Sequence, residues 1–237
     1  MQKRNKIGVI VFPGSNCDHD AVSVINSFQN TEAVMLWHKE RNLQNCDAII
    51  LPGGFSYGDY LRTGAIAKFS PVMEEVFRFS NEGRPVIGIC NGFQILTEAG
   101  LLDGALMRNA SRRFVCRFVH LKVVTQNCFV TAQYQKDEII KIPIAHGEGN
   151  FFASEDTLKS LQDEDRILFQ YCDLNGIVGD HANPNGSLLN IAGITNKQRN
   201  VVGLMPHPER AAEPRLGSTG GKKFFQSLLQ SLEPILI

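Results

Sequence analysis

The sequence has no long apolar run and no excess of charge of either sign. Its 237 residues include 24 Lys and Arg against 24 Asp and Glu, whereas a nucleic-acid groove or an anionic membrane surface normally needs a basic excess. No stretch approaches the roughly 20 apolar residues of a membrane-spanning helix. The early apolar run Ile7–Phe12 is too short for a signal peptide and lacks a cleavage site of small residues. We therefore expect a cytoplasmic protein whose partners are neither nucleic acids nor membranes.

Paired cysteine spacings, repeats, low-complexity tracts and linkers are also missing. The six cysteines, at positions 17, 46, 90, 116, 128 and 172, are scattered, which favours reduced thiols over disulfides. Cys17 and His19 are close in sequence, but no second ligand pair follows at zinc spacing, so we expect no metal site. With nothing to divide the chain, residues 1–237 are expected to form one domain.

Short apolar runs alternate with segments of helical spacing in the first half of the chain. The expected strands there are Ile7–Phe12, Ala33–Trp37, Asp47–Leu51 and Val86–Cys90. The expected helices are Asp18–Phe28, Tyr60–Asn81 with a break near Pro71, and Phe93–Ala99. This alternation is typical of a parallel sheet covered by helices.

After Gly104 the pattern is typical of antiparallel strands. The later strands are expected at Arg113–Thr125, Cys128–Gln133, Ile139–Ala145, Ile167–Tyr171, Ser187–Thr195 and Val201–Met205. Two later helices are expected within Thr157–Asp163 and Gly217–Leu232. The predicted fold class is α/β, an open, mostly parallel doubly wound sheet with a nucleophile elbow and a few antiparallel edge strands.

The segment around Cys90 predicts that elbow. The strand ending in Gly88-Ile89-Cys90 runs into Asn91-Gly92 and a helix, which is the strand–turn–helix context of an α/β nucleophile, with sulfur in place of a serine oxygen. Glycines two residues before and after Cys90 leave room for a tight turn. At the first turn of a helix the macrodipole favours a thiolate. A buried structural cysteine is the plainer alternative, and the flanking glycines favour a nucleophile.

A cysteine nucleophile needs a base and a group that orients the base. His207 and Glu209 follow an apolar strand, and residues two apart in an extended segment point the same way. We expect Glu209 to hold one ring nitrogen of His207 and to leave the other facing Cys90. The backbone N–H of Asn91 is the standard first oxyanion donor. Gly54, in the Leu51-Pro52-Gly53-Gly54 turn after a neighbouring strand, is expected to supply the second.

Several segments together resemble class I (triad-type) glutamine amidotransferases. The segments that carry the likeness are Gly88–Gln94, Leu51–Gly54 and His207–Glu209. Peripheral blocks are similar to those of the glutaminase subunits of phosphoribosylformylglycinamidine synthases, namely Phe12–Asp18, Gly53–Arg62, Ala145–Gly149, Asn183–Ser187 and Met205–Arg210. The resemblance runs from about residue 7 to about residue 230, and every triad position matches.

The resemblance implies a function and partners. Cys90, His207 and Glu209 would be the triad, Gly54 and Asn91 the oxyanion donors, and Gln94, His146 and Gly147 would contact L-glutamine. The ammonia released would pass to an ATP-dependent synthetase subunit that acts on formylglycinamide ribonucleotide in purine biosynthesis, usually with a small third subunit. No cofactor is expected in this chain, and ATP and Mg²⁺ would belong to the synthetase.

Three alternatives remain open at this point. The chain could be the glutaminase of a different synthetase, because the triad is common to the whole class. It could be a cysteine hydrolase or chaperone-like protein on the same fold, although those usually carry their histidine near the elbow. It could also be a non-enzymatic regulatory subunit, which the complete triad disfavours.

Overall fold

The computed structural model describes residues 4–233. Its main sheet has nine strands in the order β2-β1-β3-β4-β11-β10-β9-β6-β7. The strands are β1 (Asn5–Val11), β2 (Thr31–Trp37), β3 (Ala48–Leu51), β4 (Val86–Ile89), β6 (Val115–Val123), β7 (Ile139–His146), β9 (Ile167–Cys172), β10 (Ile191–Thr195) and β11 (Val201–Leu204). Two short strands, β5 (Ala105–Met107) and β8 (Asn150–Phe152), form a separate antiparallel pair.

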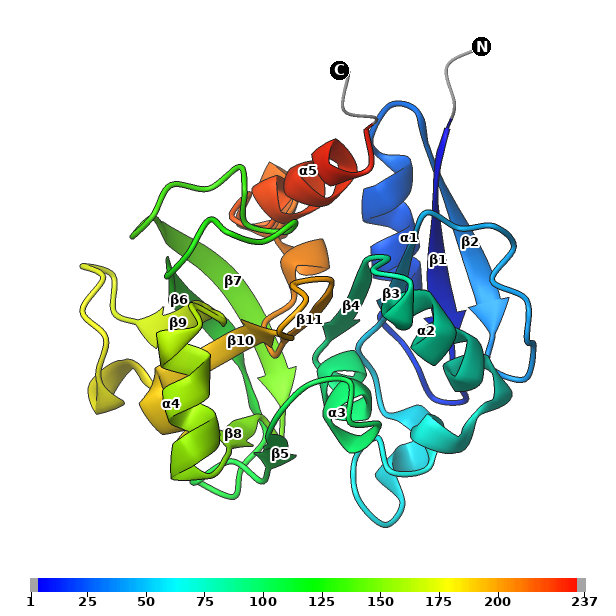
Figure 1. Cartoon of the computed structure of the whole chain (residues 1–237). Helices are drawn as coiled ribbons and strands as arrows, with labels where there is room; N and C mark the ends of the chain where they lie inside the picture. The colour runs from blue at the N-terminus through cyan, green and yellow to red at the C-terminus, as the bar shows by residue number, and fades with distance from the viewer. Residues whose placement is uncertain (1–3, 234–237) are drawn as a thin grey trace.

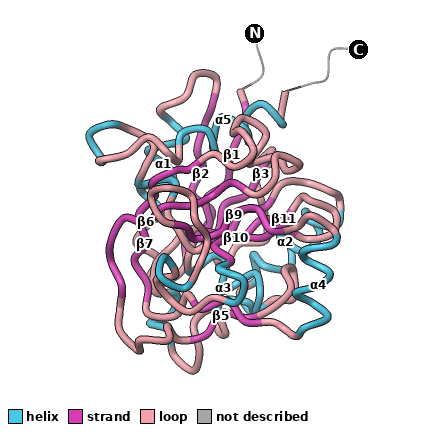
Figure 2. The backbone as a smooth tube through the Cα atoms, turned by 90° about the vertical axis from the view of Figure 1, so that its left-hand side faces the viewer, coloured by secondary structure: helices cyan, strands magenta, loops and turns pink. Residues whose placement is uncertain are grey.

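Helices cover both faces of the parallel half of the sheet, which comprises β2, β1, β3, β4 and β11. Helix α1 (Asp18–Asn26) lies on one face, and α2 (Pro71–Asn81) and α3 (Asn91–Glu98) lie on the other (Figures 1 and 2). All residues of β3, β4 and β11 are buried. Strands covered on both faces read as continuous apolar runs, which is why the sequence predicts them well. The doubly wound α/β fold class is confirmed.

The other half of the sheet is antiparallel from β11 through β10, β9 and β6 to β7. Helix α4 (Glu155–Asp163) precedes β9 of this half in the sequence. Helix α5 (Lys222–Ser231) is the last element of the described residues. The antiparallel portion is therefore larger than a few edge strands. No helix within residues 4–233 is long and apolar enough to cross a membrane.

The prediction of a strand at Cys128–Gln133 is wrong, because this segment is a series of turns. The amide of Thr131 donates to the carbonyl of Cys128, and the amide of Tyr134 donates to that of Thr131. Val130 and Thr131 are adjacent and both fully buried. A strand with one buried face would alternate inside and outside positions instead.

Of the stretch expected to be helical over Tyr60–Asn81, with a break near Pro71, only the part from Pro71 onward is an α-helix. Proline suits the first helical position because its missing N–H has no intrahelical partner there. The preceding segment is irregular, with one 3₁₀ turn at Ala67–Phe69. Its large apolar residues Tyr60, Leu61 and Phe69 are exposed, so they do not form the buried stripe of an amphipathic helix.

Candidate active site

Cys90 occupies a sharp turn between β4 and α3. Its backbone has φ 50° and ψ −104°, a strained conformation for a residue with a side chain. A Cβ at Gly92 would lie 1.9 Å from the carbonyl oxygen of Leu51, and one at Gly88 would lie 2.6 Å from the backbone of Gly92. The two flanking glycines are therefore required by close backbone contacts at the elbow, as the sequence indicates.

Three side chains from distant segments meet beside Gly53. A Cβ at this glycine would lie 2.7 Å from His207 Cε1, 3.0 Å from Cys17 Sγ and 3.4 Å from Cys90 Cβ. Because Gly53 has no side chain, the imidazole of His207 and the side chains of Cys17 and Cys90 can occupy this space. The structure thus brings His207 against Cys90, and it adds Cys17, to which the sequence assigns no role.

Glu209 holds the ring of His207. Glu209 Oε1 lies 2.6 Å from His207 Nδ1, and both residues are at most 3% exposed. His207 and Glu209 lie in and beside a 3₁₀ turn at Pro208–Arg210, not in the extended segment expected, yet their side chains still meet. His207 Nε2 is buried and has no partner with hydrogen-bond geometry among residues 4–233. It is the ring nitrogen left free for a reacting group.

The charges around His207 favour its protonated form. Burial acts to lower its pKa, but the Glu209 carboxylate and the neighbouring Cys90 raise it, and the net pKa lies well above the ordinary value. The Cys17 thiol is buried, and burial raises its pKa above the ordinary value. The guanidinium of Arg210 donates to Cys17 Sγ at 3.1 Å and is anchored on Asp20 at 2.8 Å.

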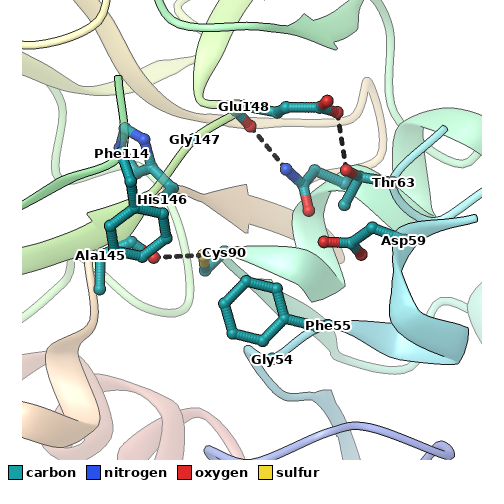
Figure 3. A pocket seen from close by; sticks show the side chains of 11 residues that line it. Gly54, Phe55, Asp59, Thr63, Cys90, Phe114, Ala145, His146, Gly147 and Glu148 are labelled. Atoms are coloured by element: carbon teal, nitrogen blue, oxygen red, sulfur yellow. Dashed lines mark hydrogen bonds between the residues drawn. The ribbon is translucent and has the colours of Figure 1, made fainter. Parts of the chain in front are cut away.

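Two cavities of about 180 Å³ each open onto Cys90. Both are lined by Gly54, Phe55, Phe114 and Ala145, and Cys90 Sγ lies 3.7 Å from the carbonyl oxygen of Ala145. The first is lined by Asp59, Thr63, Gln94 and His146–Glu148 as well, and is drawn in Figure 3. The second extends to Cys17, His207 and Arg210. Although Cys90 is only 5% exposed, its thiol faces both cavities.

Asn109 anchors the loop that carries His146 and Gly147. Its amide donates to the carbonyl of Gly147 at 2.9 Å, and its side-chain Nδ2 donates to that of His146 at 2.9 Å. Its Oδ1 accepts from the amide of Gly149 at 3.0 Å and lies 3.2 Å from His146 Nδ1. Burial, with a smaller contribution from His207, lowers the pKa of His146 to about 4, so its ring is neutral at pH 7.

Gln94 is held in place by protein groups. Its Oε1 accepts from Asn91 Nδ2 at 3.0 Å, and its Nε2 donates to the carbonyl of Glu148 at 2.5 Å. Asn91 in turn accepts from the amide of Ser56 at 3.1 Å. This chain of hydrogen bonds ties the start of α3 to the two loops that line the first cavity.

Comparison with known proteins gives the family. The model of the CobB/CobQ-like glutamine amidotransferase domain matches residues 4–223. The phosphoribosylformylglycinamidine synthase subunit PurQ of Chlorobaculum parvum is 58% identical over 226 residues, which cover 95% of this chain and 90% of that protein. The subunit of the same name from Methanosarcina mazei is 52% identical over 223 residues, covering 94% of this chain and 96% of that protein. The chain belongs to the glutamine amidotransferase family.

A solved structure agrees with this assignment, and a second supports the fold. A chain in the structure of PurLQS from Thermotoga maritima superposes with a TM-score of 0.86 at 40% identity, covering 97% of this chain and 100% of that one. A glutamine amidotransferase of the same organism, at 17% identity and a TM-score of 0.60, supports the fold alone.

This glutamine amidotransferase places all eight predicted residues around one cleft. Cys90, Gln94, His146, Gly147 and Gly54 line the first cavity, His207 lines the second, and Asn91 and Glu209 adjoin them. Their individual roles stay predictions. Sequence reasoning missed Asp59 and Asn109, because polar residues in turns and loops give no periodic signal. It also missed Phe114, which is expected within the strand Arg113–Thr125 but lies just before β6. The sequence Asn109-Ala110-Ser111 instead resembles a glycosylation acceptor.

Proposed function

We propose that this chain is the glutaminase subunit of a phosphoribosylformylglycinamidine synthase. It hydrolyses glutamine and passes ammonia to an ATP-dependent synthetase that converts formylglycinamide ribonucleotide to formylglycinamidine ribonucleotide. The names of relatives at 52–58% identity over nearly the whole chain support this assignment. The observation that carries the chemistry is the elbow thiol of Cys90 beside a buried imidazole that Glu209 holds at 2.6 Å.

The first half of the reaction forms a thioester. The sulfur of Cys90 attacks the carboxamide carbon of glutamine, and the electron pair of the C=O bond moves onto oxygen. The backbone N–H groups of Gly54 and Asn91 are the donors proposed for that oxygen. When the oxyanion collapses, the C–N bond breaks, and protonated His207 gives its proton to the leaving nitrogen as ammonia departs. The high pKa of His207 suits this role, because the ring carries the proton before the leaving group needs it.

The second half returns the enzyme to its resting state. Neutral His207 takes a proton from water, whose oxygen attacks the glutamyl thioester. The C–S bond then breaks, and glutamate leaves with sulfur regenerated. Glu209 holds the ring in one orientation through both halves, and its charge stabilises the imidazolium.

The ammonia requires a partner, since in water it would be protonated and lost as a nucleophile. The likeness to a chain of PurLQS supports a synthetase subunit and a small third subunit as partners. We assign ATP and Mg²⁺ to the synthetase and no cofactor to this chain. A cytoplasmic location, in keeping with six unpaired cysteines in the structure, is part of the same proposal.

The test is Cys90→Ser in the assembled synthase. We expect glutamine-dependent synthesis to be lost, because a serine hydroxyl is a far weaker nucleophile at neutral pH, while synthesis from added ammonium salts continues. Cys116→Ser, which changes an exposed thiol on β6, is the matched control and should retain both activities. Glutamine-dependent synthesis by Cys90→Ser at the wild-type rate would refute the assignment.

A further inference from the structure

Asp59 presents a carboxylate to the first cavity. Its Oδ1 is buried, and within residues 4–233 it has no hydrogen-bond partner. Figure 3 shows the carboxylate pointing from its loop toward the side of the cavity where Cys90 lies. A buried carboxylate oxygen without a donor is costly, so a donor supplied by a ligand would stabilise it.

The charges around Asp59 favour a cation at this end of the cavity. Glu148 lies close enough to raise its pKa, and the Glu148 carboxylate is itself satisfied by the hydroxyl of Thr63 at 2.6 Å and by Arg108 at 3.5 Å. Arg62, on the same loop as Asp59, is paired with Glu98 at 2.6 Å. Among the described residues that line this cavity, Asp59 is therefore the acidic group whose buried oxygen still lacks a donor.

Glutamine brings such a cation. When its carboxamide carbon is at Cys90 Sγ, its side chain extends from that group to the α-carbon, which carries an ammonium with three donors. Figure 3 shows Cys90 on one side of the cavity and Asp59, Thr63 and Glu148 on the other, so a glutamine held at Cys90 would extend its α-carbon toward Asp59. A charge-assisted hydrogen bond from the ammonium would supply the donor that Asp59 Oδ1 lacks.

We propose that Asp59 accepts the α-ammonium group of glutamine and makes this cavity select α-amino acids over amides that lack that group. This inference rests on the proposed glutaminase function. Asp59 binds the substrate and takes no part in the proton transfers of the reaction.

The titration of Asp59 adds a pH signature. Burial and the nearby Glu148 raise the pKa of Asp59 to about 6. The carboxylate is ionised above this pH and neutral below it. Glutamine binding should therefore weaken as the pH falls below about 6, whereas an amide without the ammonium should be insensitive to this group.

The experiment compares two substrates on the assembled synthase. One is glutamine, and the other is glutaramate, in which hydrogen replaces the α-ammonium. The variant is Asp59→Asn, because asparagine keeps the shape and tolerates the backbone φ of 54° at this position. Its thermal unfolding midpoint checks that it folds as the wild type does. Glu98→Gln is the matched control, since it removes the carboxylate that pairs with Arg62 on the same loop but does not line the cavity.

We expect Asp59→Asn to raise the KM for glutamine about 10- to 100-fold, the loss typical of a hydrogen bond to a charged group. Its kcat for glutamine and its kcat/KM for glutaramate should stay close to wild type, and the decline in glutamine kcat/KM near pH 6 should disappear. Equal losses with both substrates, or an unchanged KM for glutamine, would overturn the inference. Failure of the wild-type synthase to use glutamine would instead overturn the proposed function.

Discussion

Removing the charge of Glu209 tests how the site keeps His207 protonated. Glu209→Gln preserves shape and leaves an amide oxygen able to accept from Nδ1, so the ring orientation should survive. The loss is confined to the electrostatic attraction between the carboxylate and the imidazolium. Because both groups are at most 3% exposed, solvent screens this attraction little.

The size of the effect comes from Coulomb's law. Two unit charges roughly 4 Å apart at an effective dielectric constant of about 20 attract by about 4 kcal/mol. Since about 1.36 kcal/mol corresponds to a factor of ten in rate, the expected loss in glutamine kcat/KM approaches about 10³-fold. This loss is an upper limit, because the glutamine amide of Glu209→Gln can still accept a hydrogen bond from the ring.

The assay is glutamine-dependent synthesis by the assembled enzyme as a function of pH. The pKa of His207 lies well above its ordinary value, so the wild-type ring loses its proton at a higher pH than an ordinary imidazole does, and this loss sets the alkaline limb of the profile. In Glu209→Gln this alkaline limb of the kcat/KM profile should move to lower pH. Ammonia-dependent synthesis is the internal control and should not change.

Two results would refute this reasoning. A variant within a few-fold of wild type at pH 7 would show that the carboxylate does not support the reacting form of His207. An equal loss of ammonia-dependent synthesis would show that the substitution disturbs subunit assembly rather than glutamine hydrolysis.

Two further predictions concern folding. Gly92→Ala places a methyl group 1.9 Å from the carbonyl oxygen of Leu51, so this variant should not fold stably. At Gly100 an added methyl group would meet nothing within 4 Å, but the backbone φ is +73°. Gly100→Ala should therefore lower the free energy of unfolding, measured by chemical denaturation, by only roughly 1–2 kcal/mol. His146 has a pKa of about 4 in the folded chain against about 6.5 when unfolded, so the unfolded state binds the extra proton between these values. The free energy of unfolding should therefore fall by about 3 kcal/mol as the pH drops from 7 to 4. His146→Asn should lose this part of the pH dependence. A pH dependence equal to that of the wild type would contradict the low pKa assigned to His146.

The sequence predicts best those parts of the fold that local pattern determines. Strands such as Val86–Ile89 are short apolar runs bounded by turn residues, and all their residues are buried. The prediction fails where tertiary contacts override the pattern. The apolar residues Tyr60, Leu61 and Phe69 are exposed along an irregular path, in which Leu61 has a φ of 71°, and no hydrophobic periodicity encodes such a path.

The candidate site divides in a similar way. Cys90 is recognisable because an elbow needs small neighbours at fixed positions, and that need leaves a local motif. Asp59 and Asn109 leave none, because each acts through partners far along the chain. Asn109, for example, contacts the loop His146–Gly149, which lies 37 to 40 residues further on.

The convergence of distant segments on Cys90 has a topological cause. β4 lies between β3 and β11, and both neighbours are parallel to it, with Leu51 opposite Gly88 and Leu204 opposite Ile89. The three strands therefore end at the same edge of the sheet.

The segments that leave these strands then have to lie beside Cys90. β3 continues into Gly53 and Gly54, β11 continues into His207, and the loop after β1 is tied in by a hydrogen bond from the amide of Cys17 to the carbonyl of Gly53. The antiparallel β7 joins them because the amide of His207 donates to the carbonyl of Pro143 at 2.9 Å. A change of register in any of these strands would move its group away from the sulfur. The same ladders that stabilise the sheet thus set the geometry on which the proposed glutamine hydrolysis depends.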